Sequence, residues 1–385
     1  MRPVEWRDLP LIEIAERFVN GGTPDTRVFE YWGGKIPWIT SADIISFRVS
    51  KGRKEITQAG VDHSSTNLVP ENTVLFVTRV GVGKVGVSAN PLCFSQDITG
   101  IVCKSFVHPE YLARYLSSIQ NRLVYRVRGS TIKGLSRKDF SDIMVPIPPL
   151  STQRKIVAII NHSERLKELR LKTIQMSNRV LQNVFSSMFD TANFPKEPIA
   201  KHVSSIQLKN PRKKPDDYFK YIDIAGIDNK IGKIIEIKTI LGKDAPSRAR
   251  KEIKKEDVIV STVRPNLNAT ALVPAELDNQ ICSTGFAVLR SKSSLNPIYL
   301  YAFTRQREFV KALIAKMKGA SYPAVTDKDV LSVEIRVPPI EIQNKFAFIA
   351  TKSELMRDRQ STSLQEITEL FDSIMYKAFK GELVQ

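Results

Sequence analysis

GSTIKGLSRKDFSDIMVPIPPLSTQRKI, residues 129–156, occurs a second time as GASYPAVTDKDVLSVEIRVPPIEIQNKF at residues 319–346. The two copies align without a gap at an offset of 190 residues (319 minus 129), nearly half of the 385-residue chain. Each copy predicts a strand, then a Pro-Pro pair, then a long helix. A repeat of this length predicts a fold built from two similar halves. The identical pairs are Gly129/Gly319, Lys138/Lys328, Asp139/Asp329, Pro148/Pro338, Pro149/Pro339, Gln153/Gln343 and Lys155/Lys345.

The composition is that of a globular protein with an unusual charge. Lysine and arginine number 58 against 40 acidic residues, a formal charge of +18 and a pI near 9.7. Such an excess attracts polyanions, and nucleic acid is the first candidate. A membrane is disfavoured, because no apolar run reaches about 18 residues and the polar start is not a secretory signal. Three cysteines in so long a chain argue against a disulfide framework. We expect a soluble, cytoplasmic protein of two domains.

Both halves show the same order of elements. In the first half, apolar periodicity predicts a helix, several strands (one buried on both faces) and a second helix that opens with proline. A basic segment that carries glycine follows, and we expect it to form a hairpin. The expected elements are a helix at 8–20, strands at 36–40, 74–80, 85–88, 100–103 and 143–147, a helix at 109–120 and the basic hairpin at 121–136.

Two segments without glycine or proline, 151–189 and 341–380, predict long helices. Apolar residues recur in them at seven-residue spacing, as Ile160, Ile174, Leu181 and Met188 show, which is typical of a coiled coil. Gly381 is a natural stop for the second helix. A helix of about 39 residues spans roughly 58 Å, which can hold two domains on major-groove segments one or more turns of about 34 Å apart.

The offset between the halves drifts outside the helices. We match Trp38 with Tyr221 (183), Arg79 with Arg264 (185) and Pro109 with Pro297 (188). We also match Asp97–Gly100 with Cys282–Gly285. The helices therefore repeat strictly and the globular parts loosely. Variable loops on a common scaffold are what two different binding specificities require.

Several motifs that suggest other functions favour a structural interpretation. The sequence Gly81-x-Gly83-x-x-Gly86 resembles a dinucleotide loop, but no helix start follows, so we interpret it as a hairpin. Asn296-Pro297-Ile298-Tyr299 comes near a methyltransferase tetrad, yet the equivalent His108-Pro109-Glu110-Tyr111 is a plain helix opening. The four histidines are scattered, without metal-ligand spacing. We therefore assign no catalytic, cofactor-binding or metal-binding residue to this chain.

What remains are basic and polar side chains at the strand ends and in the hairpin of each half. Arginine can pair with guanine and asparagine with adenine, whereas lysine, serine and threonine commonly hold phosphates. The alternative for each is a solvated surface residue, and for Arg79 and Arg264 an arginine paired with an acid such as Asp97. Our candidate DNA-binding residues are Thr78, Arg79, Lys84, Arg126, Arg128, Thr131, Lys133, Thr262, Arg264, Asn266, Asn268, Lys318, Ser321 and Tyr322.

The whole chain resembles the specificity subunit of type I restriction–modification enzymes. The resemblance is carried by the duplicated block, the loop Asn20-Gly21-Gly22-Thr23-Pro24 and the final F-K-G-E-L at 379–383. It implies two target-recognition domains, each reading one half of a split double-stranded DNA site, held by two long antiparallel helices. It also implies two methyltransferase subunits that carry S-adenosylmethionine, and a motor-nuclease subunit that can join them. Tyr322-Pro323-Ala324 departs from Ile132-Lys133-Gly134, so the second hairpin can be placed differently.

The expected fold class is α+β: two repeated α/β target-recognition domains separated by two coiled-coil helices, with pseudo-twofold symmetry. The domains are expected at 1–150 and 193–340, and the spacer helices at 151–192 and 341–385. The expected function is a non-catalytic DNA-recognition subunit that binds a bipartite asymmetric target and scaffolds the methyltransferase. Two alternatives stay open: a nucleic-acid-modifying enzyme with an unrecognised active site, and a structural RNA-binding adaptor.

Overall fold

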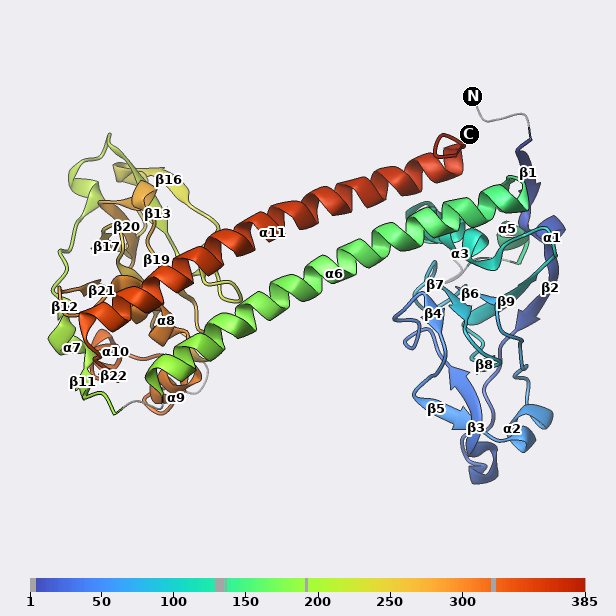
Figure 1. The fold of residues 1–385 in the computed structure, drawn as a ribbon, viewed down its shortest axis with the longest axis horizontal. Helices are drawn as coiled ribbons and strands as arrows, with labels where there is room; N and C mark the ends of the chain where they lie inside the picture. Colours follow the sequence, from blue (N-terminus) through green and yellow to red (C-terminus); the bar gives the residue numbers. More distant parts are fainter. Residues whose placement is uncertain (1–4, 129–134, 136, 191–192, 320–322, 385) are drawn as a thin grey trace. The chain divides into compact units, whose positions relative to one another are not determined.

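The computed structural model describes residues 5–128, 135, 137–190, 193–319 and 323–384. The chain forms two compact units, one of Met1–Leu171 with Thr362–Gln385 and one of Lys172–Ser361. We call the globular part of the first unit head 1 (residues 5–149) and that of the second unit head 2 (residues 193–339). Figure 1 labels the helices and strands of each unit.

Three sheets form the described part of head 1. Strand β6, predicted to be buried on both faces, is buried at every residue and lies inside the largest of these sheets between β9 and β7. The strands of that sheet, in spatial order, are β2 (Ala15–Asn20), β9 (Ile98–Cys103), β6 (Val74–Val77), β7 (Val85–Ser88) and β4 (Arg48–Val49). The other two sheets are β5 (Lys54–Ile56), β3 (Trp32–Ile39) and β8 (Cys93–Phe94), and β1 (Arg7–Pro10) with β10 (Met144–Ile147).

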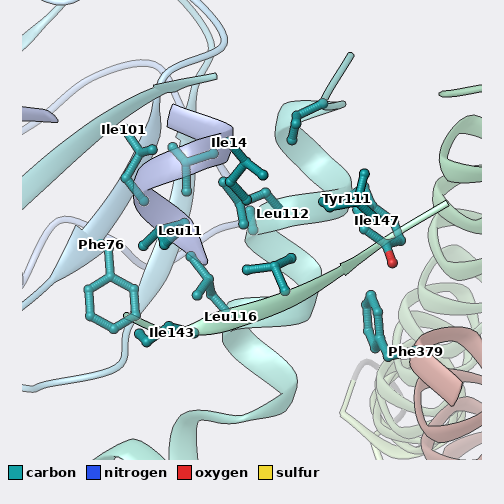
Figure 2. Packing of buried hydrophobic residues seen from close by; sticks show 14 of the residues in the cluster. Leu11, Ile14, Phe76, Ile101, Tyr111, Leu112, Leu116, Ile143, Ile147 and Phe379 are labelled. Carbon is teal, nitrogen blue, oxygen red and sulfur yellow. The ribbon is translucent and has the colours of Figure 1, made fainter. Parts of the chain in front are cut away.

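The core of head 1 lies between the sheet that contains β6 and helix α3 (Pro109–Ser118). Figure 2 shows Leu112 and Leu116 packed near Leu11 and Ile14, with Phe76 close by. Proline at the first position of α3 fits there because its missing N–H needs no partner. The remaining helices of the head are α1 (Leu11–Ile14), α2 (Gln58–Asp62), α4 (Gln120–Arg128), α5 (Arg137–Ser141) and the 3-10 turn η1 (Phe29–Tyr31).

Two predictions for head 1 are wrong. The helix predicted at 8–20 is a single helical turn, α1, between strands β1 and β2. Leu11 and Ile14 are buried, but the strands on either side take their hydrogen bonds from β10 and β9, which overrides the local helical spacing. Residues 121–128 of the expected basic hairpin belong to helix α4 instead, with Leu123 buried as its anchor.

Head 2 repeats this order of elements. Its strand β18 is again buried at every residue and lies between β21 and β19. One sheet has the order β12 (Val203–Ser204), β21 (Phe286–Ser291), β18 (Val258–Ser261) and β19 (Thr270–Leu272), and another β16 (Lys238–Leu241), β13 (Tyr218–Ile222), β20 (Gln280–Ser283) and β17 (Ala249–Ile253). Two short pairs are β11 (Lys196–Pro198) with β22 (Glu334–Arg336), and β14 (Ile227–Asp228) with β15 (Lys233–Ile234). The helices are α7 (Ile199–His202), α8 (Pro297–Thr304), α9 (Arg307–Ile314) and α10 (Asp327–Leu331), with 3-10 turns η2 (Pro211–Lys213), η3 (Ile224–Gly226), η4 (Gly242–Asp244), η5 (Pro265–Leu267) and η6 (Ala275–Leu277).

The strand registers fix how the two heads correspond. Trp38 pairs with Cys93 as Tyr221 pairs with Ile281, which confirms the predicted match of Trp38 with Tyr221. Val77 pairs with Ile98 as Ser261 pairs with Phe286, so Val77 corresponds to Ser261. Arg79 then corresponds to Val263 rather than to Arg264, and Asp97 to Gly285 rather than to Cys282. Both predicted matches are wrong because the offset is not constant: it is 184 at β6 and β18 (261 minus 77) and 188 at β9 and β21 (286 minus 98).

The two long helices begin and end within one residue of the predicted ranges. They are α6 (Leu150–Phe189) and α11 (Ile340–Lys380), and Gly381 follows with a positive φ of 78°. In the first unit the start of α6 shares a core with Phe379 near the end of α11. In the second unit Phe185 and Phe189, near the end of α6, contact Phe346 near the start of α11. The helix segments therefore run antiparallel in each unit.

Taken together, these elements confirm the predicted fold class: two repeated heads of mixed helix and sheet, and two long helices. The proposed division into four segments at 150, 192 and 340 stays a prediction, since the compact units combine each head with parts of both helices.

An identical glutamine joins each head to the first turn of its long helix. Gln153 is fully buried; its amide donates to the carbonyl oxygens of Phe106 (2.9 Å) and Pro148 (2.8 Å) and accepts from the N–H of His108 (2.7 Å). Gln343 does the same in head 2, donating to Ser294 (3.1 Å) and Pro338 (2.8 Å) and accepting from Asn296 (2.8 Å).

Candidate nucleic-acid interface

The candidate site of each head lies where its central buried strand ends. Thr78 follows β6, and its N–H (2.9 Å) and hydroxyl (3.3 Å) both donate to the carbonyl of Asp97. Thr262 follows β18 and donates in the same way to Gly285, at 2.8 and 2.9 Å. Both threonines are buried. Their hydroxyls therefore hold the strand end to the neighbouring loop, and the contact of these threonines with DNA stays a prediction.

In both heads the repeated block (129–156 and 319–346) forms a backbone hydrogen bond with this strand end. The N–H of Leu135 donates to the carbonyl of Thr78 (3.0 Å), and that of Val325 to Thr262 (2.9 Å). In head 2 the chain also closes on itself between Lys318 and Ala324, with two backbone hydrogen bonds of 3.0 Å. The N–H of Arg264 donates to Pro323 (2.8 Å) in the same region. The structure therefore brings the segments of Arg264 and Lys318 together.

In head 1 the exposed basic residues of the site lie on the turn after β6. Gly81 and Gly83 have positive φ values of 86° and 89°, and strand β7 follows them. This confirms a hairpin rather than a cofactor loop. Lys84 is exposed, and its ammonium donates to the carbonyl of Ser41 (3.3 Å). Arg79 is exposed too, and within the described residues it forms no ion pair with Asp97. The structural pairing considered for this arginine is thus not found.

In head 2 the matching turn is a short 3-10 segment, η5, bounded by two residues in the left-handed region. These are Arg264 (φ 48°) and Asn268 (φ 50°). Asn266 between them is exposed. Asn268 is tied inward: its amide oxygen accepts from the hydroxyl of Thr270 (3.0 Å) and its carbonyl from Arg305 (3.1 Å). Asn268 therefore shapes the turn, whereas Arg264 and Asn266 present their side chains at its surface.

The basic hairpin residues of the prediction are placed only in part. Arg126 and Arg128 belong to helix α4. Thr131, Lys133, Ser321 and Tyr322 lie outside the described residues, so their assignment stays a prediction. Lys318 is exposed, and its charge and that of Lys316 help the hydrogen bonds from Thr326 lower the pKa of Asp329. This places positive charge at the start of α10.

The structure adds residues that the sequence analysis missed. Helix α4 begins against the turn after β6, since a side chain at Gly83 would meet Gln120. Arg122 is exposed on this helix, and Tyr125 is 81% exposed. Aromatic rings beside basic groups are typical of surfaces that contact bases. The sequence pattern that could have indicated this helix is the apolar Leu123 between charged residues. We interpreted this segment as part of a hairpin.

A second missed feature is an exposed basic run in head 2. The guanidinium of Arg212 donates to the carbonyl of Ala245 (2.8 and 3.0 Å), which ties η2 to η4. This contact gathers lysines from two separate loops. The sequence signal was the run K-N-P-R-K-K at 209–214. The exposed lysines of this group are Lys209, Lys213, Lys214 and Lys243.

The remaining motifs have structural roles. The side chain of Asn296 caps α8 by accepting from the N–H groups of Ile298 (2.9 Å) and Tyr299 (3.3 Å). The Tyr299 hydroxyl donates to Arg336 (2.8 Å), just as that of Tyr111 donates to Pro146 (2.6 Å). Both tetrads are therefore helix openings, as predicted.

The part of the chain that the structure describes holds no group of three or more His, Cys, Asp or Glu side chains placed to bind a metal ion. Within the same residues, none of the helices is long and apolar enough to cross a membrane.

Comparison with known proteins matches the whole arrangement. The family model of the type I restriction modification DNA specificity domain matches residues 3–176 and 201–368. The MjaIX specificity subunit of Methanocaldococcus jannaschii is 23% identical over 99% of this chain and 94% of its own. The EcoR124I/EcoR124II specificity subunit of Escherichia coli is 29% identical over 42% of this chain and 41% of its own.

Solved structures share the fold over the full length. A chain from work on complex assembly and conformational transition of the type I R-M system covers 100% of both chains, with 18% identity and a TM-score of 0.65. The type I restriction–modification S subunit from M. genitalium covers 97% of this chain and 96% of its own, with 14% identity and a TM-score of 0.57.

Proposed function

Because the chain belongs to the type I restriction modification DNA specificity domain family, we propose that it is the DNA-recognition subunit of such a system. Each head contacts one half of a two-part, asymmetric double-stranded target. The long helices join the heads and carry the other subunits. The chain itself is non-catalytic and acts in the cytoplasm.

One observation carries this proposal: the fold is duplicated, but the surfaces at the strand ends are not. Thr78 and Thr262 hold equivalent strand ends with the same hydrogen bonds. Beyond them, head 1 has a glycine turn with Arg79 and Lys84, and head 2 has a 3-10 turn with Arg264 and Asn266. A common scaffold with different exposed side chains supports the reading of two different sequences.

Exposed apolar side chains on the long helices support a role as a scaffold. Two of these positions repeat at the offset of 190: Val180 (58% exposed) matches Leu370 (55%), and Leu166 (42%) matches Met356 (63%). Single exposed apolar residues are common, whereas contiguous apolar patches mark sites of protein contact. The duplication of these positions fits two copies of one partner, which we assign as the methyltransferase subunits. These subunits hold S-adenosylmethionine in our proposal, and a motor-nuclease subunit joins the assembly.

Methyl transfer with the chain alone and with its methyltransferase partner tests this proposal. Labelled S-adenosylmethionine and duplex DNA are incubated with each preparation, and the modified positions are then sequenced. We expect no transfer by the chain alone and, with the partner, methylation confined to a two-part motif. Transfer by the chain alone would indicate an enzyme, and tighter binding to A-form RNA than to B-form DNA would indicate an RNA adaptor; either result contradicts the proposal.

A further inference from the structure

A glutamate occupies the same place on both long helices. Glu164 lies on α6 and Glu354 on α11, at the repeat offset of 190. Each forms an ion pair with a cation from the head that precedes its helix in the chain: Arg114 for Glu164 and Lys233 for Glu354. The glutamates are equivalent, but the cations come from different elements, α3 in head 1 and β15 in head 2. Each head therefore contacts its helix at an equivalent glutamate, but the cation of the ion pair comes from a different element in each head.

In head 1 the cation of this contact is buried, whereas the Glu164 side chain is 37% exposed. The Arg114 side chain is 7% exposed and pairs with Glu164. The same nitrogen donates to the amide oxygen of Asn161 on α6 (2.9 Å), and the guanidinium carbon lies 3.6 Å from the centre of the Phe47 ring. A cation held by a carboxylate, an amide and an aromatic face has little freedom to move. Head 1 is thus held firmly on α6.

Head 2 lacks this arginine. Tyr111 and Tyr299 open equivalent helices and donate to equivalent strands, so the residue that matches Arg114 is Ala302. A cavity of about 220 Å³ lies at this place, lined in part by Ala302, Arg305 and Glu354. The alanine supplies no cation from α8, so the cation that Glu354 meets on a helix is Arg357 of α11 itself (2.9 Å).

Lys233, the first residue of β15, makes the corresponding contact in head 2. Lys233 pairs with Glu354 (3.2 Å) and with Asp358 (2.7 Å), and its side chain is 35% exposed. The loop that carries it is fixed to α8, because the Tyr301 hydroxyl donates to Gly232 (2.9 Å) and Arg305 donates to Lys230 (2.9 Å). An ion pair exposed to this degree is screened by water and weaker than a buried one. Head 2 is therefore held more loosely on α11.

We infer that Arg114–Glu164 and Lys233–Glu354 are positioning contacts that determine how strictly the protein discriminates the number of base pairs between the two halves of its target. The inference rests on the proposed function. It assigns these side chains no contact with DNA. Loss of either contact lets a head tilt on its helix, so targets with one base pair more or less are bound better. Head 1, whose cation is buried and held by three groups, contributes more of the discrimination than head 2.

A binding selection with a fixed pair of half-sites and spacers of varied length tests this inference. The assembled complex with the methyltransferase is used as wild type, Arg114→Met, Glu164→Gln and Lys233→Met. We expect the preference for the correct spacer to fall about tenfold in the two head 1 variants and about threefold in Lys233→Met. Preference within each half-site should stay as in wild type, which a general loss of structure would not allow.

Two variants serve as controls. Lys233→Arg keeps the charge and should keep wild-type discrimination. Lys196→Met removes an ion pair with Glu308 (3.0 Å) that lies within head 2 and does not reach α11, so it should also behave as wild type. Unchanged spacer preference in Glu164→Gln and Lys233→Met would overturn the inference. A wild-type complex without any half-site preference would instead overturn the proposed function, and the inference with it.

Discussion

At the scale of single residues, Gln153 and Gln343 explain part of the repeat that first identified the fold. Each is wholly buried and completes hydrogen bonds for three backbone groups at the junction of head and helix. An unsatisfied buried polar group costs about 1–3 kcal/mol. The identity of this pair therefore reflects a structural requirement rather than contact with DNA.

Gln153→Leu should lower the free energy of unfolding of the first unit by about 2–5 kcal/mol, since the leucine leaves those backbone groups without a partner. Denaturant unfolding followed by circular dichroism measures the change. Gln175→Leu, at an exposed position on the same helix, should change stability by less than about 0.5 kcal/mol. Equal effects of the two substitutions would contradict the role of Gln153.

The three cysteines give a second prediction at this scale. Burial raises the pKa of Cys93 to about 11 and the pKa values of Cys103 and Cys282 to about 12. Only the thiolate reacts with a disulfide reagent, so the folded protein should react very slowly at pH 8 and release three thiol equivalents once denatured. Rapid reaction of a thiol in the folded protein would show that its site is open.

At the scale of secondary-structure elements, long periodic segments were predictable and short ones were not. The bounds of α6 and α11 follow from the sequence because a long helix repeats one pattern many times. α1 is a single turn whose neighbours are strands, so the helical spacing of Leu11 and Ile14 predicted too long a helix. Helix α4 was missed because the arginines around Leu123, which is buried, led us to interpret the segment as a basic hairpin.

The candidate site was predictable in outline for the same reason. The sequence located Arg79, Lys84 and Arg264 near strand ends, and the structure places them in the turns that follow β6 and β18. It could not show that Thr78, Thr262 and Asn268 direct their polar atoms inward, because that depends on carbonyl groups distant in sequence. It also could not fix the register past a loop that differs in length between the halves.

The long helices are best anchored near the heads, not in their middle. Phe346 is fully buried against Phe185, Phe189 and Tyr299, whereas Ile174 is half-buried. Phe346→Ala should therefore cost about 3–5 kcal/mol in the second unit. Met176→Ala, at a position 65% exposed, should cost less than about 0.5 kcal/mol. Denaturant unfolding of both variants measures these losses. A similar loss of stability in the two variants would contradict the role of Phe346 in anchoring the helices.

At the scale of the whole molecule, the charge of +18 predicts how binding depends on salt. Basic residues that contact phosphates release counterions, so affinity falls steeply as salt rises. We expect a loss of about 1,000-fold or more in affinity between 50 and 200 mM salt. Titration of labelled duplex at several salt concentrations measures this slope. A nearly flat slope would contradict binding along the DNA backbone.

The central claim is that each head reads its own half of the target, and one selection tests it most directly. Wild type, Arg79→Ala and Arg264→Ala, each assembled with the methyltransferase, are offered duplexes with both half-sites randomised. A lost base contact costs about 1–3 kcal/mol at the position it reads. We expect Arg79→Ala to relax base preference in one half of the target and Arg264→Ala to relax it in the other. Relaxation of the same half by both variants would contradict it.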